Sequence, residues 1–532
     1  MTTHALPAPT NREDLMRRLA QPRQYDVAVI GGGATGLGVA LDAAARGFSV
    51  VLVDSHDFAK GTSSRSTKLV HGGVRYLAQG NVGLVREALH ERSRLLANAP
   101  HLAQPLAFVM PSYRWWEAPF YGLGLKMYDA LAGKAGLGRT EFLSRGETVA
   151  CLPTIQTKGV QGRLRGGVKY WDGQFDDARL ALALARTAAQ NGALLVNYCA
   201  ATALMHNGGK LVGFHALDQE SGRAYEVKAT CVVNAAGVWV DELRRLDGQA
   251  IGREASPIVA PSQGIHVVVD RDFLPGHHAM LVPKTTDGRV LFAVPWMGKT
   301  LLGTTDTPRD DLDREPLAFK DELDFILRES SRYLTRAPRQ ADIKSLWVGL
   351  RPLVKPPKDD VANTKAFSRE HTISISSSGL VTVTGGKWTT YRAMAEDVLE
   401  QCEGSGLLQK RPAITAQLKL VGAQTSVCSL SEPPGIHLYG SEASDVLAMQ
   451  RRGDPDFAGG LTAAMVRFAV QHEYARTVED VLARRSRLLF LDAALASQLA
   501  DDVALVMAEE TGLRPDVQSF KSLCSQYLNC PN

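Results

Sequence analysis

The apolar positions from Tyr25 to Ile30 form a short, continuous run that is rich in β-branched residues. Such a run is typical of a strand that is buried on both faces of a parallel sheet. A helical segment follows over Ala34 to Arg46, Gly47 ends it, and Ser49 to Val53 form a second apolar run. The order strand, helix, strand predicts an α/β domain with a parallel sheet.

The pattern changes further along the chain. Short alternating runs separated by turns occupy Ser256 to Thr305, which predicts an antiparallel sheet. Leu317 to Arg336 is predicted to be a helix, and Leu380 to Thr384 a further buried strand. Residues 404–435 are rich in Gly, Ser, Thr and Pro and are typical of a linker, and the remainder has helical character.

A chain of 532 residues is long enough for several domains. We therefore predict an α/β fold with three parts: a Rossmann-like nucleotide-binding domain, an antiparallel-sheet domain that caps it, and a C-terminal α-helical domain. The predicted bounds are 20–110, 160–240 and 340–403 for the nucleotide-binding domain, 111–159 and 241–339 for the cap domain, and 404–532 for the helical domain.

Three glycines follow the first predicted strand at G-x-G-x-x-G spacing. The first allows a tight turn, the second lets the backbone approach a pyrophosphate, and the third lets the helix pack close to the strand. An acid about 20 residues further on is placed to bind ribose hydroxyls. A glycine-rich turn of some other α/β protein is the alternative. The complete unit favours dinucleotide binding by Gly31, Gly32, Gly33, Ala34, Thr35, Gly36 and Asp54.

The segment that follows Asp54 crowds hydroxyls, glycines and basic side chains into residues 61–77. Hydroxyls donate hydrogen bonds and glycines permit close approach, so the segment is predicted to run along a phosphate-bearing cofactor. A polar surface loop is the alternative. The residues predicted to contact the cofactor here are Thr62, Ser63, Ser64, Thr67, Lys68, His71 and Gly72.

Later turns indicate further backbone contacts with the same cofactor. The apolar run Thr230 to Asn234 leads into a small-residue turn at residues 235–239, and Gly385-Gly386 opens another helix whose N-terminus can face an anion. The predicted helix from Ala178 to Asn191 begins after two aspartates, and either Asp176 or Asp177 is placed to cap it.

Composition excludes several classes of protein. A net charge of +4 is too small to indicate nucleic-acid binding. Seven cysteines without C-x-x-C spacing favour a reducing compartment and argue against a disulfide framework and a zinc site, and we predict no metal. The N-terminal residues do not have the character of a secretory signal. No run in the chain approaches the ~20 apolar residues that are needed to span a bilayer, so any membrane association is expected to be peripheral or monotopic.

Two stretches combine features that suit a membrane surface. Tyr113 to Lys134 interleaves aromatic and basic residues, among them Trp115, Trp116 and Phe120. Packing of this stretch on the protein's own core is the alternative. The second stretch is the basic cluster Arg484, Arg485 and Arg487.

A set of motifs resembles one family, the FAD-dependent glycerol-3-phosphate dehydrogenases of respiratory chains, within the D-amino-acid-oxidase-like flavoproteins. The motifs run in family order from about residue 25 to 400, and the helical tail also fits. They are GGGATG, TSSRSTKLVHGGVRYL, DDARL, NAAGVW, GIHVVV, GTTDT, GLRPL, SREHT and GGKWTTYR.

The resemblance implies roles for individual residues. It implies His266 near the reacting carbon, Arg351 holding the substrate, and Lys387 beside flavin and substrate, all three with catalytic roles. The implied substrate-binding residues are Arg75, Tyr76, Thr305 and Arg369, and the further implied cofactor-binding residues are Ala201, Gly237, Gly386, Lys387 and Thr389. Ser262-Gln263-Gly264 and Trp388 depart from the family pattern, where Lys-Gly-Ser and Leu are usual.

The chemistry of these side chains agrees with the resemblance. Guanidinium groups bind a phosphomonoester dianion with two parallel hydrogen bonds and keep their charge. A histidine has a near-neutral reference pKa, which suits a general base for an alcohol proton. Arg351 or Lys387 would stabilise the developing alkoxide and the reduced, anionic flavin.

The resemblance implies oxidation of sn-glycerol 3-phosphate to dihydroxyacetone phosphate, with hydride transfer to FAD and electrons passed to a membrane quinone. It implies a cytoplasmic, monotopic enzyme on the inner face of the cell membrane, and a homodimer is compatible with it. Three alternatives stay open: a glycerol-3-phosphate oxidase that uses O₂, a flavoenzyme acting on a 2-hydroxy or amino acid, and a flavin-binding scaffold without turnover. We expect FAD to be bound without a covalent link, although His71 is a residue type that forms flavin bonds.

Overall fold

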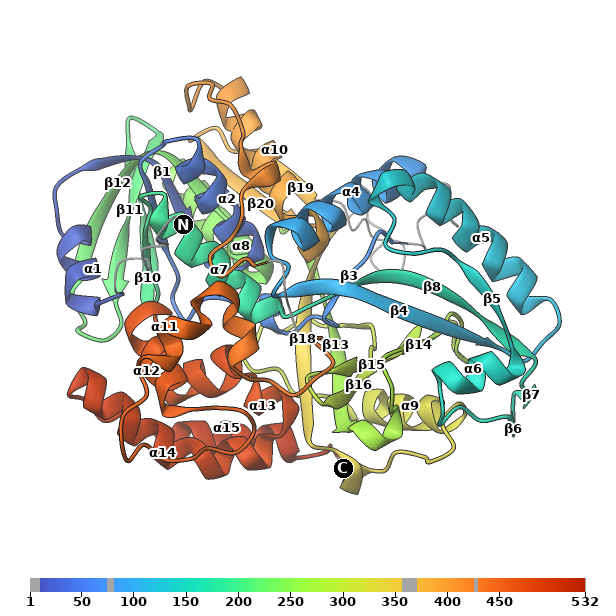
Figure 1. The fold of residues 1–532 in the computed structure, drawn as a ribbon. Coiled ribbons are helices and arrows are strands. Elements are labelled where there is room, and N and C mark those ends of the chain that lie inside the picture. Colours follow the sequence, from blue (N-terminus) through green and yellow to red (C-terminus); the bar gives the residue numbers. More distant parts are fainter. Residues whose placement is uncertain (1–9, 74–80, 356–370, 425–428, 532) are drawn as a thin grey trace.

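The computed structural model of the protein describes residues 10–73, 81–355, 371–424 and 429–531. Three parts lie side by side in it: a first sheet with its helices, a second sheet, and a cluster of C-terminal helices that contacts both (Figure 1). The fold is the mixed α/β architecture that the sequence predicts, and its C-terminal part is helical as expected.

The first sheet has eight strands, and its centre is parallel. β1 (Gln24–Ile30) lies between β2 (Val50–Val53) and β12 (Ala224–Asn234), and β20 (Leu380–Gly385) continues the parallel part beside β12. The outer strands are β9 (Leu194–Val196), β10 (Cys199–Asn207), β11 (Lys210–Asp218) and β19 (His371–Ile375).

Helices cover this sheet because its apolar strands need partners on both faces. α2 (Ala34–Ala45) packs between α7 (Asp177–Gln190) and α10 (Tyr391–Gly404). Asp176 caps α7 by accepting a hydrogen bond from the Arg179 amide, which decides between the two predicted capping residues. The remaining helices near this sheet are α1 (Arg12–Leu19) and α8 (Val240–Ala250).

The second sheet has ten strands. Its middle is antiparallel, as the alternating pattern predicts, with β13 (Val259–Asp270) paired to both β16 (Lys299–Gly303) and β18 (Ser345–Val354). The other strands are β3 (Leu69–Val70), β4 (Ala103–Ser112), β5 (Glu141–Ser144), β8 (Gly166–Phe175), β14 (Ala279–Val282), β15 (Leu291–Trp296) and β17 (Thr307–Pro308).

This sheet extends beyond the predicted bounds of the cap domain. The predicted bounds place β8, β18 and all but the last two residues of β4 in the nucleotide-binding domain, but all three strands belong to the second sheet. β4 and β8 are buried almost throughout, so their apolar runs cannot be distinguished from parallel strands by pattern alone. Four helices lie along this part of the fold: α4 (Val82–Asn98), α5 (Glu117–Ala132), α6 (Arg145–Cys151) and α9 (Lys320–Ser331), the last shorter at both ends than predicted.

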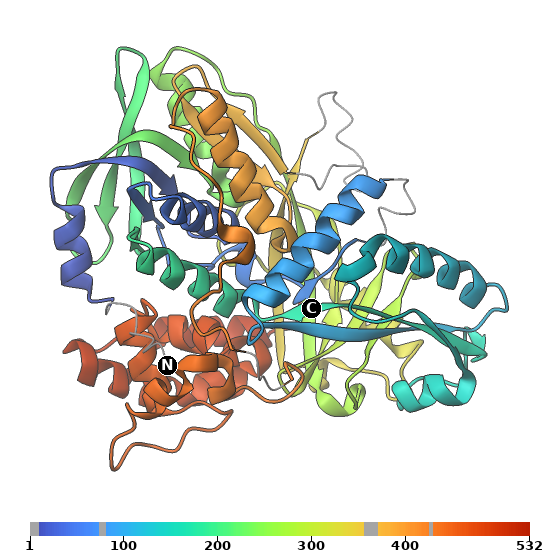
Figure 2. The same ribbon diagram turned by 45° about the horizontal axis from the view of Figure 1, so that its top comes forward.

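The C-terminal helices pack below the first sheet with its helices and beside the second sheet (Figure 2). Their apolar side chains share one core with the second sheet, in which Phe490 packs edge-on against Trp347 of β18. Because this core is continuous, the helical part is fixed to the sheet rather than tethered by a linker. Its helices are α11 (Ala443–Leu447), α12 (Ala463–His472), a π-helical turn (Asp480–Arg485), α13 (Leu488–Leu491), α14 (Ala493–Thr511) and α15 (Gln518–Leu528).

Candidate active site

The glycine turn between β1 and α2 has a shape that only glycine permits. Gly31 has a φ of 111°, and a Cβ atom added to Gly36 would lie 1.9 Å from the Gly31 carbonyl oxygen. Gly33 precedes the first turn of α2, and no side chain caps the helix there. Glycines around the N-terminus of α2 therefore leave room for a phosphate to approach the helix backbone.

Asp54 lies beside this turn, at the end of β2. Its carboxylate accepts hydrogen bonds from the amides of Gly32, at 2.6 Å, and His56, at 2.8 Å. Burial raises the pKa of Asp54 to about 6, although these amide donors and the charge of Arg314 oppose the shift. A half-buried carboxylate next to a helix N-terminus suits the ribose and pyrophosphate of a dinucleotide, so these residues fit the ADP half of FAD.

The loop after Asp54 is fixed from three directions. Ser63 Oγ accepts a hydrogen bond from the Ala34 amide at 2.9 Å. Thr62 donates to the carbonyl of Leu350 in β18 at 2.6 Å, which ties the loop to the second sheet. The indole of Trp388 donates to the Ser63 carbonyl at 2.8 Å, so this departure from the family pattern adds a contact to the loop.

Other predicted cofactor residues lie near the two turns that follow β12 and β20. Gly237 and Gly386 both adopt positive φ values, 62° and 75°, in those turns. Thr389 accepts a hydrogen bond from the His71 amide at 3.2 Å, which brings two of these residues together. The Gly72 amide donates to the hydroxyl of Tyr128 at 2.8 Å, whereas Ala201 lies in β10, at the edge of the first sheet.

His266 lies in β13, buried beneath the same loop. Its Nε2 is 2.9 Å from the Thr67 hydroxyl, and its ring stacks on Trp347 with 4.2 Å between ring centroids. Its Nδ1 is buried and has no hydrogen-bond partner among the described residues. Burial, with the positive charges of Lys68 and Arg351, holds the pKa of His266 well below its ordinary value. The imidazole is therefore neutral at pH 7, the form that accepts a proton.

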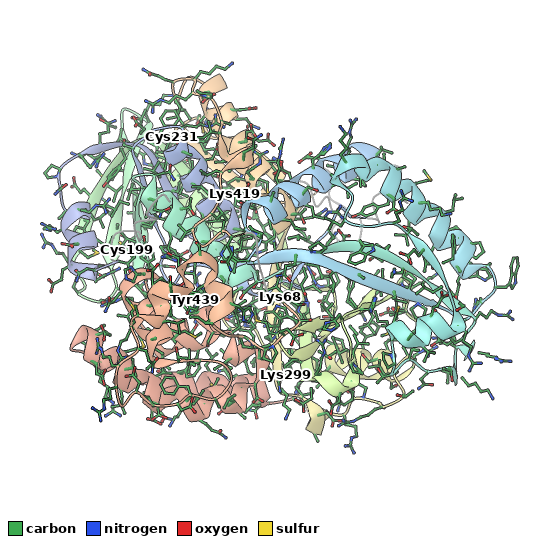
Figure 3. All side chains as sticks on the ribbon, viewed as in Figure 1. Lys68, Cys199, Cys231, Lys299, Lys419 and Tyr439 are labelled. Atoms are coloured by element: carbon green, nitrogen blue, oxygen red, sulfur yellow. The ribbon has the colours of Figure 1, made fainter. Side chains whose placement is uncertain are left out.

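Lys68 has another position than the one predicted from the sequence. Its ammonium is fully buried and forms an ion pair with Asp177 at 2.7 Å. The ammonium also lies over the ring of Trp347, 4.6 Å from the ring centroid. Trp347 in turn stacks on His266. Figure 3 shows Lys68 near the middle of the molecule, where the three parts meet. The Lys68 side chain therefore forms an interior ion pair rather than a cofactor contact, and its positive charge lowers the pKa of His266.

Arg351 lies in β18, four residues after Trp347, the residue that pairs with His266 in β13. Its guanidinium donates to the Gln263 carbonyl at 3.1 Å, to the Thr304 hydroxyl at 3.0 Å and to the Thr305 carbonyl at 2.9 Å. The side chain keeps 24% of its surface exposed. A cation held at this orientation beside a neutral histidine is suited to an anionic, hydroxyl-bearing substrate.

The prediction for Thr305 is wrong as regards its side chain. The Thr305 hydroxyl is buried, donates to Glu322 at 2.9 Å and accepts from the Ile265 amide at 3.0 Å. It therefore fixes β13 next to His266 rather than facing a substrate. Thr304, whose hydroxyl contacts Arg351, was not predicted. Arg75, Tyr76 and Arg369 lie outside the described residues, and Lys387 precedes the helical turn that leads into α10.

The basic cluster near the C-terminus is internal, which overturns its prediction as a membrane contact. Arg484 and Arg485 are each 2% exposed, and Arg487 is 0% exposed. Arg484 and Arg485 bind the carboxylate of Asp57, and Arg487 binds Asp177 at 3.0 Å. A sequence pattern of clustered arginines favours an exposed surface, because the partners Asp57 and Asp177 lie more than 300 residues away in the sequence.

Comparisons with known proteins place these features in one family. A model described as "FAD dependent oxidoreductase" matches residues 26–392, and one described as "C-terminal domain of alpha-glycerophosphate oxidase" matches residues 413–518. The chain is 39% identical to "Glycerol-3-phosphate dehydrogenase, mitochondrial" of Rattus norvegicus, over 94% of this chain and 72% of that protein. It is 36% identical to the protein of the same name of Schizosaccharomyces pombe, over 96% and 88%.

Solved structures agree with the sequence comparisons. The fold resembles the glycerol-3-phosphate dehydrogenase from Bacillus halodurans complexed with FAD, with a TM-score of 0.76, 28% identity and 98% of each chain covered. It also resembles the reduced L-alpha-glycerophosphate oxidase from Mycoplasma pneumoniae with FAD bound, with a TM-score of 0.54, 17% identity and 71% and 94% of the two chains covered. At that identity the second likeness concerns the fold alone.

Proposed function

The chain belongs to the FAD-dependent glycerol-3-phosphate dehydrogenases, and we propose that it oxidises sn-glycerol 3-phosphate to dihydroxyacetone phosphate and passes the electrons to a membrane quinone. One observation carries the substrate assignment. A neutral, buried His266 lies beside the cation Arg351 and under the cofactor loop, so that one site combines a proton acceptor, an anion binder and a flavin seat.

FAD and the residues around His266 have separate roles in the proposed reaction. Bound FAD supplies the acceptor for the hydride that leaves the alcohol carbon. His266 accepts the hydroxyl proton, and Thr67 and Trp347 fix the orientation of its ring. The positive charges that lower the pKa of His266 are offset when a phosphate dianion binds, so the imidazole becomes a stronger base when substrate is present.

Substrate binding falls to the cations around the histidine. Arg351 binds the anionic substrate with a guanidinium that is already oriented by three hydrogen bonds, which reduces the entropy lost on binding. By the family resemblance, Arg75, Tyr76 and Arg369 complete the substrate pocket, and Lys387 lies beside flavin and substrate. A panel of glycerol 3-phosphate, lactate, 2-hydroxyglutarate and D-amino acids tests this assignment through anaerobic flavin reduction.

A quinone is the proposed electron acceptor. This proposal is supported by relatives named dehydrogenases, which match at 36–39% identity over most of the chain. Turnover with a soluble quinone analogue, without stoichiometric hydrogen peroxide, supports a dehydrogenase. Oxygen consumption with one peroxide per substrate would instead identify an oxidase.

A surface on α5 supports attachment to a membrane. None of the described helices is both long enough and apolar enough to cross a bilayer. Phe120, Leu123 and Met127 lie along one side of α5 and are 66%, 66% and 53% exposed, and Trp115 just before the helix is 76% exposed. Exposed rings and aliphatic side chains on one helix suit the acyl boundary of a monotopic protein.

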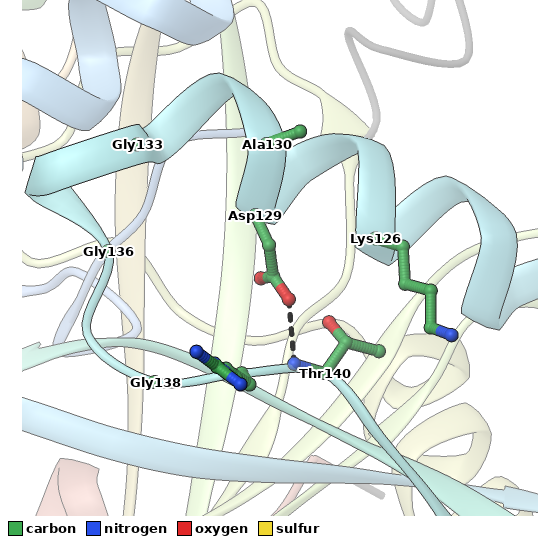
Figure 4. A pocket seen from close by; sticks show the side chains of 8 residues that line it. Lys126, Asp129, Ala130, Gly133, Gly136, Gly138 and Thr140 are labelled. Carbon is green, nitrogen blue, oxygen red and sulfur yellow. Dashed lines mark hydrogen bonds between the residues drawn. The ribbon is translucent and has the colours of Figure 1, made fainter.

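Cations flank this apolar stripe. A surface cavity of about 530 Å³ lies at the C-terminal end of α5, lined by Lys126 and Arg139, with Asp129 bound to the Thr140 amide at its edge (Figure 4). Each cation near an anionic leaflet contributes about 1 kcal/mol to binding. We propose that this face rests on the inner leaflet of the cell membrane, with the rest of the enzyme in the cytoplasm.

Flotation with vesicles tests the membrane proposal. Wild type should float with vesicles that contain anionic phospholipid, Phe120→Ser/Leu123→Ser should stay at the bottom, and Lys126→Glu/Arg139→Glu should float less. Leu505→Ser, which removes an apolar side chain that is 51% exposed on α14, is the matched control and should float as wild type does. A wild type that stays at the bottom would exclude membrane attachment, and equal flotation of all variants would exclude this face.

A further inference from the structure

The described residues 54–68 between β2 and β3, here called the cofactor loop, contain two lysines and one arginine, and each forms an ion pair. Lys60 forms ion pairs with Glu479 at 2.6 Å and Glu315 at 3.2 Å. Arg65 pairs with Glu315 at 2.7 Å, and Lys68 pairs with Asp177. The pyrophosphate of FAD carries two negative charges, and the loop beside its predicted seat supplies no uncompensated positive charge.

Arg314 also lies near the cofactor loop, but unlike these three residues it has no ion-pair partner among the described residues. It lies in the connection between β17 and α9, and its guanidinium stacks on the ring of Trp239 at 3.9 Å from the centroid. Arg314 is exposed as a residue, but partial desolvation of its guanidinium lowers its pKa, and the negative charges of Asp54 and Glu242 oppose this shift. The charge of Arg314 in turn acts on Asp54.

The connection that carries Arg314 is held across the cofactor loop. The Trp239 indole donates to the Leu312 carbonyl at 3.1 Å, and Glu315 bridges Lys60 and Arg65. Trp239 ends the turn that follows β12, and a Cβ atom added to Gly61 of the cofactor loop would lie 3.3 Å from its ring. Anchors on both sides of Arg314 therefore fix its guanidinium over the turn and near Asp54.

We propose that Arg314 is a binding residue for the ADP half of FAD, and that its guanidinium neutralises the pyrophosphate. The flat stack on Trp239 holds the guanidinium in place before the cofactor arrives, so little side-chain entropy is lost when it binds. The connection from Leu312 to Glu315 then acts as a strap across the ADP end of the site. This inference needs the cofactor assignment but not the substrate or acceptor proposed above.

Ligands that contain only one half of FAD distinguish the two ends of its binding site. The full-length apoprotein is titrated calorimetrically at low salt with FAD, with ADP and with FMN, for wild type and for Arg314→Gln. Arg314→Gln removes a charge-assisted hydrogen bond between a partly exposed guanidinium and the pyrophosphate. This loss should weaken FAD and ADP binding by about tenfold. FMN binding should change by less than about twofold, because FMN lacks the pyrophosphate and adenosine.

Two further variants control the result. Arg328→Gln removes one exposed arginine from α9 and should leave all three affinities unchanged. Arg314→Lys keeps the charge but loses the flat stack, and its ADP affinity should fall between those of wild type and Arg314→Gln. The loss in Arg314→Gln should also shrink as salt is raised. Unchanged ADP affinity in Arg314→Gln, an equal loss for FMN, or an equal loss in Arg328→Gln would overturn the proposal.

Discussion

Replacement of Asp57 by asparagine should strongly destabilise the nucleotide-binding domain, because Asp57 neutralises two buried arginines. Its carboxylate binds Arg484 and Arg485, and it also accepts a hydrogen bond from Asn197 at 3.2 Å. Arg484 has other partners, Glu479 and Asp480, but Asp57 is the single carboxylate paired with Arg485 among the described residues. The asparagine variant therefore leaves a buried guanidinium without a counter-charge.

The size of the effect follows from this geometry. Breaking a buried ion pair by removal of one partner costs about 3–5 kcal/mol. For a unit of a few hundred residues this corresponds to a fall of roughly 10 °C in the unfolding midpoint. Asp57 also lies three residues after Asp54, so its release should loosen Asp54, the predicted ribose-binding acid, and the loop that follows it.

The assay is the temperature at which flavin fluorescence appears as the holoenzyme loses its cofactor. Asp501→Asn breaks an exposed pair with Lys521 and is the matched control, with an expected change of less than about 3 °C. A midpoint for Asp57→Asn within the range of that control would refute the account of a buried network.

The pH dependence gives a second test of the same variant. Burial would raise the pKa of Asp57, but Arg485 and Arg484 outweigh it and hold this pKa below its ordinary value. A carboxylate with a lowered folded pKa stabilises the protein above its unfolded pKa, about 3.9, and loses this contribution as the pH falls through the folded value. The difference in unfolding midpoint between wild type and Asp57→Asn should therefore be the same at pH 5 and pH 8.

Four other outcomes are expected. His266→Ala should slow anaerobic flavin reduction by about 10²–10⁴-fold with a smaller change in substrate affinity, measured by stopped flow. Arg351→Lys should raise KM strongly, because a lysine cannot reproduce the guanidinium geometry, and wild-type kinetics would contradict this. FAD affinity should fall as the pH drops through about 6, where Asp54 becomes protonated and a poorer acceptor, and Asp54→Asn should remove that dependence. Acid precipitation should leave the flavin in the supernatant, and flavin on the pellet would indicate a covalent link, with His71 as the first candidate.

Local sequence signals predicted the parts of the fold that local geometry decides. The glycine spacing, the acid at Asp54 and the cap at Asp176 each depend on residues within about 25 positions of one another. The resemblance added His266 and Arg351, which β13 and β18 bring to the same side of the second sheet.

Long-range pairing was not accessible in the same way. The partners of Arg485 and Lys68 are Asp57 and Asp177, which are 428 and 109 residues away. Burial of such charges is rare enough that a solvent-exposed cluster is the natural expectation. The Thr305 hydroxyl was misjudged for a related reason, since its partner Glu322 lies on a helix whose packing the sequence pattern does not specify.

The central claim is that this site oxidises glycerol 3-phosphate with bound FAD. The most direct test is to mix the oxidised holoenzyme with glycerol 3-phosphate under anaerobic conditions and to follow the flavin absorbance. We predict rapid and complete bleaching by glycerol 3-phosphate and no bleaching by lactate, 2-hydroxyglutarate or D-amino acids. Flavin that stays oxidised with glycerol 3-phosphate, or that is reduced faster by one of the acids, would contradict the account.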